Sequence, residues 1–147
     1  MASTTSKLGL TKPASGEAYS IDVVNQNMQK IDDFAADLTR KTTHRGTANS
    51  NYISALEGQI VRNGSVVSGY FVLTVNADFS AASIQLISNL PAAYNQDVQL
   101  PCIGLSGTNI NKASRVKITT SGTIVTWYGF SFKSGEAYLI PVNYICA

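Results

Sequence analysis

The sequence predicts an α+β chain with three parts: an N-terminal extended arm, a short trimeric coiled-coil helix and a C-terminal antiparallel β-sandwich or jelly-roll head. Apolar residues recur at alternating spacings of three and four across residues 21–38, whereas the period changes to two after residue 57. Residues 1–20 show neither period. We therefore expect an arm at 1–20, a helix at 21–41, a connector at 42–57 and the head at 58–147.

The arm carries a few apolar and turn residues but is too short to form a core of its own. Lys12 precedes a proline, which disfavours helix at that position. Such a segment is either disordered or docked on another surface. The residues that we expect to anchor its docking are Leu8, Leu10, Pro13 and Tyr19.

The helix is predicted to begin after Ser20, a favourable N-cap, with Asp22 near the positive end of the helix dipole. Its apolar residues form a narrow seam of heptad type, which copies of the same helix bury best. The alternative is an amphipathic helix packed on its own globular domain, although such a helix usually has a broader apolar stripe. The seam, which we expect to be an oligomer interface, consists of Ile21, Val24, Met28, Ile31, Ala35 and Leu38.

The width of the seam and the absence of a partner helix in the sequence both bear on self-association. Phe34 lies beside the seam and widens it, which favours three chains over two. No second helical pattern is present to pair with the seam. We therefore expect a parallel oligomer.

The head is predicted from short alternating segments separated by turn residues. Asn63 and Gly64 form a strong signal for a two-residue hairpin, and Phe71, Leu73 and Val75 alternate on one face. A strand at 123–132 places Val125 and Trp127 on the face opposite to Ile124, Thr126, Tyr128, Phe130 and Phe132. About seven or eight such strands within about ninety residues are typical of a sandwich or jelly roll. Within the connector, Tyr52, Ile53 and Leu56 are expected to form a short helix or a contact at the junction of the helical stalk and the head.

Composition and motifs argue against several classes of function. The net charge is +2, and no dense cluster of Lys and Arg supports nucleic-acid binding. No apolar run has the length of a membrane span, and the N-terminus lacks a signal-peptide pattern, so we expect synthesis in the cytosol. Cys102 and Cys146 are then expected to be reduced and buried, with a disulfide between them as the alternative.

Residues for catalysis or metal binding are scarce. His44 is the only histidine and falls in the predicted connector, so the chain lacks the parts of a catalytic triad at a structured site. The two cysteines show no zinc-binding spacing. A glycosidase needs two carboxylates across a cleft, and each acidic residue of the head lies next to turn residues where it is expected to be solvated. We therefore predict no enzyme activity, no metal and no cofactor. The acidic residues concerned are Glu57, Asp78, Asp97 and Glu136.

Loops of the head are the expected place for recognition of a partner, because loops on a rigid scaffold carry most binding residues. Aromatic rings beside Asn and Asp groups suit saccharide recognition by stacking and hydrogen bonding. Packing against another subunit is the alternative for the tryptophan. The candidate receptor-binding residues are Tyr94, Asn95, Asp97, Asn109, Asn111 and Trp127.

A resemblance to a known class of protein rests on specific runs of sequence. The runs KLGLTKPA at residues 7–14, DVVNQN at 22–27 and KID at 30–32 resemble the N-terminal segment of tail-fibre and baseplate proteins of tailed bacteriophages. This likeness spans about residues 5 to 35. The segment ISNLP at 87–91 and the closing runs RVKI, GTI and YLIPVNYI are similar to the small β heads that end such fibres.

The resemblance implies a homotrimeric component of a virion tail, assembled in the cytoplasm of the bacterial host. Its arms would dock on other tail or baseplate proteins, and its heads would contact a host cell-surface glycan or protein. Phage-like tailocins and contractile injection systems use similar parts. The resemblance implies no contact with nucleic acid and no insertion into a membrane. One alternative is a purely structural baseplate or fibre adaptor whose head binds another tail protein, and a less favoured one is a polysaccharide depolymerase.

Overall fold

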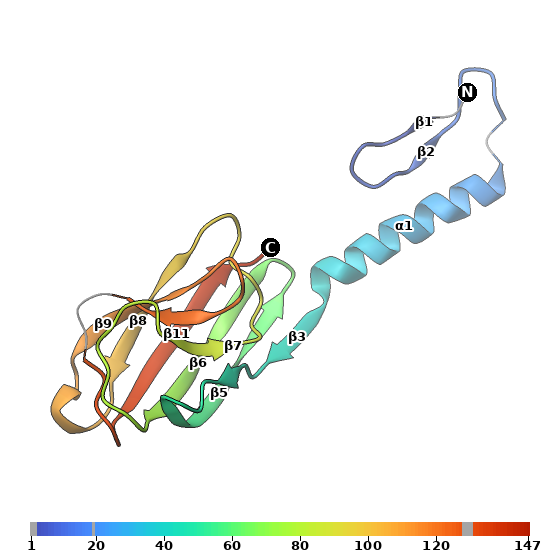
Figure 1. The fold of residues 1–147 in the computed structure, drawn as a ribbon. Coiled ribbons are helices and arrows are strands. Elements are labelled where there is room, and N and C mark those ends of the chain that lie inside the picture. The colour runs from blue at the N-terminus through green and yellow to red at the C-terminus, as the bar shows by residue number, and fades with distance from the viewer. Residues whose placement is uncertain (1–2, 19, 128–130) are drawn as a thin grey trace. The chain divides into compact units, whose positions relative to one another are not determined.

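The computed structural model describes residues 3–18, 20–127 and 131–147. The chain divides into two compact units, residues 1–40 and residues 41–147. Figure 1 shows a short hairpin and a helix in the first unit and a large antiparallel sheet in the second.

The arm forms a small hairpin where the sequence predicts an extended segment. Strands β1 (Ser3–Thr4) and β2 (Thr11–Lys12) pair antiparallel, with Ser3 opposite Lys12. The N–H of Thr5 donates to the carbonyl of Leu10 at 2.9 Å, and the Leu10 N–H donates to the Thr5 hydroxyl at 2.9 Å. These local hydrogen bonds order a segment that has no core of its own.

Helix α1 spans Ile21–Thr39 and begins where the sequence predicts. The side chain of Ser20 caps it by accepting a hydrogen bond from the N–H of Val23 at 3.3 Å. The helix ends at Thr39, and Arg40 is its C-cap, whose N–H donates to the carbonyl of Asp37 at 3.3 Å.

The described residues of the second unit form one nine-stranded antiparallel sheet with the order β3-β5-β6-β11-β8-β9-β10-β7-β4. A single 3₁₀ turn, η1 (Gly107–Asn109), lies between β8 and β9. The strands are β3 (Lys41–His44), β4 (Thr47–Ala48), β5 (Ile53–Asn63), β6 (Val66–Val75), β7 (Gln85–Ser88), β8 (Val98–Gly104), β9 (Ala113–Ile118), β10 (Ile124–Thr126) and β11 (Ala137–Ile145).

The sheet curls until its two edges lie close together. Strands β3 and β4 are at opposite ends of the strand order, yet only Arg45 and Gly46 separate them in the chain. Two residues and their flanking bonds span at most about 11 Å. A flat sheet of this width would hold its edges much farther apart, because neighbouring strands are about 4.8 Å apart. The short link therefore requires strong curvature, which Figure 1 shows in the arrangement of the strands.

The predicted fold class is wrong. Apart from one helix, the described chain is mostly antiparallel strand, and its head is a single curled sheet in place of two stacked sheets. The error has a physical origin. Alternation of apolar and polar residues shows that one face of a strand is buried, but a sandwich and a curled sheet both bury one face.

The segment expected to be a connector is also different in the structure. Residues 42–57 contribute β3, β4 and the first part of β5, and they do not form a short helix at Tyr52, Ile53 and Leu56. This segment has few apolar residues because β3 and β4 are short strands at the edges of the sheet, where few side chains are buried. His44 thus lies in β3, opposite Ile60, and its Nε2 is 3.2 Å from the hydroxyl of Thr42.

Other strands lie close to their predicted positions. The β5–β6 hairpin is present, but its two-residue turn is Gly64 and Ser65, one position later than the signal at Asn63. Gly64 has a φ of +58°, which suits glycine. The strand predicted at 123–132 is β10 in its first part. Tyr128 and Phe130, which the alternation assigned to the core face, lie outside the described residues.

The concave face of the sheet holds the hydrophobic core. Phe71, Leu73 and Val75 of β6 are buried together, as their alternation predicts. Phe132 stacks on Phe79 with ring centroids 4.7 Å apart. The core therefore joins the long central strands to the segments around Phe79 and Phe132, which lie outside the named strands.

Replacing Leu73 by alanine tests this core. Leu73 has no exposed surface, so Leu73→Ala is expected to lower the free energy of unfolding by about 2–5 kcal/mol through lost burial and a cavity. Denaturant unfolding measures the change. Val66→Ala is the matched control on the same strand: 49% of Val66 is exposed, so the loss should stay below about 1 kcal/mol. Equal losses in the two variants would contradict the assigned core.

Candidate functional site

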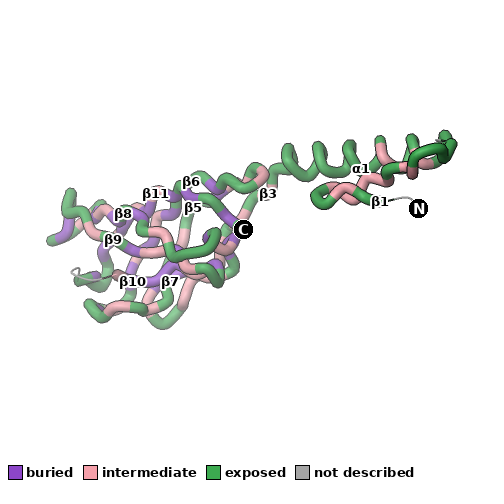
Figure 2. Tube along the Cα trace, turned by 90° about the horizontal axis from the view of Figure 1, so that it is seen from above, coloured by how far each residue is buried: buried purple, intermediate pink, exposed green. Residues whose placement is uncertain are grey.

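The apolar seam of α1 is exposed along its whole length within the described chain. We call this surface the α1 ridge: Ile21, Val24, Met28, Ile31, Ala35 and Leu38. The five large members expose between 40% and 75% of their surface, and Phe34 beside them exposes 48%. Figure 2 shows the helix almost entirely in the colour of exposed residues. Burying a large apolar side chain stabilises by about 1.5–3 kcal/mol, so this surface favours a covering partner.

The arm is held against a flank of the helix. The side-chain amide of Asn27 accepts a hydrogen bond from the N–H of Thr11 at 2.9 Å and donates to the Thr11 carbonyl at 3.0 Å. Three residues on, the ammonium of Lys30 donates to the carbonyl of Gly9 at 2.7 Å. Residues three apart lie on one helix face. The only half-buried residues of the helix are Val23 and Asn27, so the arm leaves the ridge uncovered.

The structure describes three of the four predicted docking residues of the arm. Leu8, Leu10 and Pro13 are half-buried in the arm, which leaves part of each side chain available to a partner. Tyr19 lies outside the described residues.

Two of the predicted receptor-binding residues meet on the outer face of the sheet. Asp97 forms an ion pair with Lys117 at 2.9 Å and accepts a hydrogen bond from the N–H of Thr120 at 3.2 Å. The hydrogen bond from Lys117 is the main reason that the pKa of Asp97 lies below its usual value. The same ammonium lies 4.8 Å from the ring centroid of Trp127, a cation–π distance. A lysine that the sequence analysis did not select therefore joins the two residues.

Asn109 belongs to a buried polar network and not to an exposed recognition loop. Its amide nitrogen donates to the carboxylate of Glu136 at 2.9 Å, to the hydroxyl of Tyr138 at 3.1 Å and to the carbonyl of Ser131 at 3.0 Å. The Tyr138 hydroxyl donates to Glu136 at 2.8 Å, and both the N–H and the hydroxyl of Thr108 donate to the same carboxylate. The network fastens η1 to the start of β11.

This network corrects the prediction that Glu136 is a solvated acid. Glu136 is only 7% exposed, and it fills the space where a Cβ on Gly107 would lie. Burial alone would raise the pKa of Glu136, but the hydrogen bonds from Tyr138 and Thr108 outweigh it and hold the pKa below its ordinary value of 4.5. An acid held ionised by four donors suits anchoring of a loop.

No hydrogen bond or ion pair in the described chain joins Tyr94, Asn95 or Asn111 to Asp97 or Glu136. Asn111 follows η1, beyond the end of the β8–β9 pairing at Ile103, whereas Asp97 precedes the opposite end of the same pairing at Val98. Five residue steps along a strand cover about 17 Å. Tyr94 is 56% exposed, and Asn95 follows it with a φ of +62°. The six candidates therefore do not form one site.

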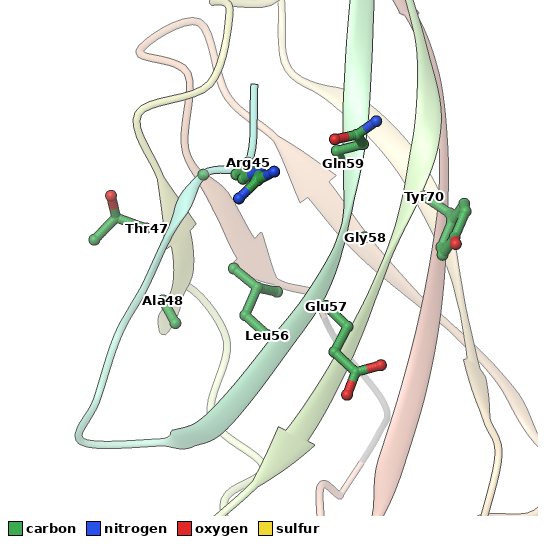
Figure 3. A pocket seen from close by; sticks show the side chains of 9 residues that line it. Arg45, Thr47, Ala48, Leu56, Glu57, Gly58, Gln59 and Tyr70 are labelled. Atoms are coloured by element: carbon green, nitrogen blue, oxygen red, sulfur yellow. The ribbon is translucent and has the colours of Figure 1, made fainter. Parts of the chain in front are cut away.

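A groove that the sequence analysis missed lies where the edges of the curled sheet approach each other. We call it the edge groove. It has a volume of about 770 Å³ and is lined by residues 45–48, residues 56–59 and Tyr70. Figure 3 shows Arg45 and Gln59 toward one end and Glu57 toward the other, with Leu56 between them. No local sequence signal marks this groove. The groove exists only because the chain leaves the edge of β5 after β3 and then pairs with β7 as β4.

The other acidic groups of the head are mostly paired. Asp78 accepts from the ammonium of Lys133 and from the N–H of Ser134, both at 2.8 Å, and these bonds keep its pKa below the usual value. Among the four acidic residues of the head, all of which are described, Glu57 has no ion-pair or hydrogen-bond partner. Within the described residues, no group of three or more His, Cys, Asp or Glu is arranged to hold a metal ion.

The two cysteines are buried and are not joined to each other. Burial raises the pKa of the Cys102 thiol to about 12. A protonated, buried thiol is a small apolar core residue and a poor nucleophile, which agrees with the interpretation from sequence.

Comparison with known proteins leaves the family open. No protein-family model matches this chain, and no curated protein matches it.

Among its described residues, the helix does not have the length and apolar character of a membrane-spanning segment.

The Glu136 network predicts a specific dependence of stability on pH. Because the pKa of Glu136 is lowered in the folded chain, the ionised carboxylate stabilises the fold above about pH 4.5, and this contribution is lost as the pH falls through the lowered value. Glu136→Gln should be less stable at pH 7, since its amide cannot accept from every donor. It should also lose less stability on acidification to pH 3.

Denaturant unfolding at pH 7 and pH 3 measures both effects. Asp78→Asn is the control, because Asp78 is exposed and shares the same sign of pKa shift without the buried network. If Glu136→Gln retained wild-type stability at pH 7, the anchoring role of the network would be refuted.

Proposed function

We propose that this chain is a subunit of a homotrimeric virion tail-fibre or baseplate tip protein. It docks on a tail through its N-terminal arm and presents its β head for recognition of the host surface. The observation that carries the proposal is the exposed α1 ridge, whose large side chains are 40–75% exposed at heptad spacing. A monomeric soluble domain seldom leaves such a stripe uncovered.

Association of copies of this chain buries the α1 ridge, and it requires no second helix in the sequence. Ridges of this spacing interlock side by side, and the polar residues that flank the ridge, such as Asp32 and Gln29, stay in water. Because each ridge contributes several large apolar side chains at about 1.5–3 kcal/mol each, burial in a trimer offsets the loss of chain freedom.

The arm supports the docking part of the proposal. Its two bonds to Asn27 and its bond to Lys30 keep it beside the ridge, so a trimer would bring three arms together at one end of the assembly. The partly exposed Leu8, Leu10 and Pro13 offer apolar contacts to a tail or baseplate protein.

The head supports a binding role over a catalytic one. Asp78 and Asp97 are paired with lysines, and Glu136 is committed to anchoring η1. A depolymerase that uses paired carboxylates therefore lacks two free acids in one place in the described head. Three heads on one trimer would turn a weak contact with a repeated surface group into tight attachment.

The oligomeric state tests the proposal directly. Wild-type protein at micromolar concentration is expected to have about three times the chain mass of 15.7 kDa in light scattering. Ile31→Asp should dissociate the trimer, because it places a charge inside the packed ridges. Gln26→Asp, on the opposite helix face, is the matched control and should remain trimeric. A monomeric wild-type protein would remove the basis of the proposal.

Attachment to cells tests the recognition role. Labelled wild-type protein should bind a subset of bacterial strains in flow cytometry, and Ile31→Asp should bind those strains at least tenfold more weakly because it loses multivalency. Gln26→Asp should bind as the wild type does. If the wild type bound no strain but bound an isolated tail protein through its head, the adaptor function would replace host recognition.

A further inference from the structure

We infer that the edge groove is a binding site for an uncharged saccharide. The inference gives the proposed host recognition a site and a ligand class, and so rests on that function. Its geometry lies within a single head, so it can be tested apart from the oligomeric state. A volume of about 770 Å³ falls within the range of small-molecule sites, about 300–1,000 Å³.

The groove gathers polar side chains that the rest of the protein does not use. Arg45, Glu57 and Gln59 line it, and none of their side chains has a hydrogen-bond or ion-pair partner in the described chain. Arg45 and Glu57 do not pair with each other. Together the three groups offer a guanidinium donor, a carboxylate acceptor and an amide that does both. Planar groups of this kind bind adjacent hydroxyls on a sugar ring.

The group formed by Asp97, Lys117 and Trp127, which we call the outer-face cluster, provides a contrast within the same head. There, Asp97 is paired with Lys117, the same lysine lies over Trp127, and Arg115 donates to the side chain of Gln99 at 2.9 Å. A ligand at that cluster would have to break existing interactions. A ligand in the edge groove would replace only water, which costs less.

Tyr70 supplies an apolar platform beside these polar groups. It is 52% exposed, and its ring lies against the backbone of Gly58. A Cβ at Gly58 would come within 3.1–3.2 Å of two ring carbons, and Gly58 has a φ of +90°, which disfavours other residues. The glycine thus allows the ring to lie close to β5. An exposed aromatic face beside hydrogen-bonding groups suits the apolar face of a sugar ring.

The free strand edge at the groove also raises the question of an extended peptide. Strand β3 pairs with β5 only at Ile60–Asn63, so residues 54–59 have no second neighbouring strand in the described chain. Two features oppose addition of a peptide strand. Pairing with β3 closes one end of this edge, and the φ of +90° at Gly58 lies outside the β region, so the free edge departs from regular extended geometry at that residue.

The balance of charge selects the class of saccharide. The groove holds one cationic and one anionic side chain, Arg45 and Glu57. An acidic saccharide would gain from the arginine but would be repelled by the carboxylate, whereas an uncharged one uses both groups as hydrogen-bond partners. We therefore expect preference for neutral over acidic sugars.

Titration calorimetry with the full-length protein tests the inference. The neutral probes are maltotetraose, cellotetraose, mannotetraose and galactotetraose, and the contrasting probes are a galacturonate tetramer and an end-blocked pentaalanine peptide. At least one neutral probe should bind more tightly than either contrasting probe. Tyr70→Ala, Glu57→Gln and Arg45→Gln should each weaken that binding about tenfold or more.

The controls separate this inference from the proposed function. Lys112→Gln removes an exposed, unpaired cation that is not part of the groove lining, and this variant should bind as the wild type does. Thermal unfolding checks that each variant folds. Absence of binding to every neutral probe, or tighter binding of an acidic or peptide probe, would overturn the inference. The inference would also be overturned if a neutral sugar bound all three groove variants as it binds the wild type but did not bind Trp127→Ala. In that case the outer face would be the site of host recognition, and the proposed function would remain.

Discussion

The two-residue link between β3 and β4 is the constraint on which the rest of the head depends. Arg45 and Gly46 join strands at opposite ends of the nine-stranded order, so the sheet has to curl until its edges are near each other. Curling creates a concave face that a single sheet could not otherwise bury. Gly46 itself lies against Ile87 and Leu90, where any side chain would collide with the core.

The same constraint creates the edge groove. After β3 the chain leaves the edge of β5, and β4 pairs with β7, with Ala48 opposite Ile87. Residues 54–59 of β5 therefore have no second neighbouring strand in the described chain. The curled sheet is therefore not fully closed. A closed barrel would have no free edge and no groove. A function at this point of the head would thus depend on incomplete closure of the sheet. The groove is lined by segments that are eight or more residues apart in the chain.

In the first unit, the arm covers one flank of α1 and leaves the adjoining α1 ridge uncovered. Asn27 and Lys30 use their polar groups to hold the arm by its backbone, and this contact does not require apolar residues of the ridge. Docking of the arm and association through the ridge are consequently compatible in one molecule. This compatibility links the proposed trimer to the proposed attachment on a tail.

Local sequence determined those features that depend on neighbouring residues. The Ser20 cap, the helix from Ile21, the exposed heptad spacing and the alternation that buries Phe71 and Leu73 all follow from side-chain period and capping chemistry. Only the tertiary structure decided that the head is one curled sheet, that Asn109 and Glu136 are buried together, and that Arg45, Glu57 and Tyr70 share a groove. The physical reason is that strand order, curvature and contacts between distant segments depend on which edges meet, and the period of a single strand carries no information about its neighbours.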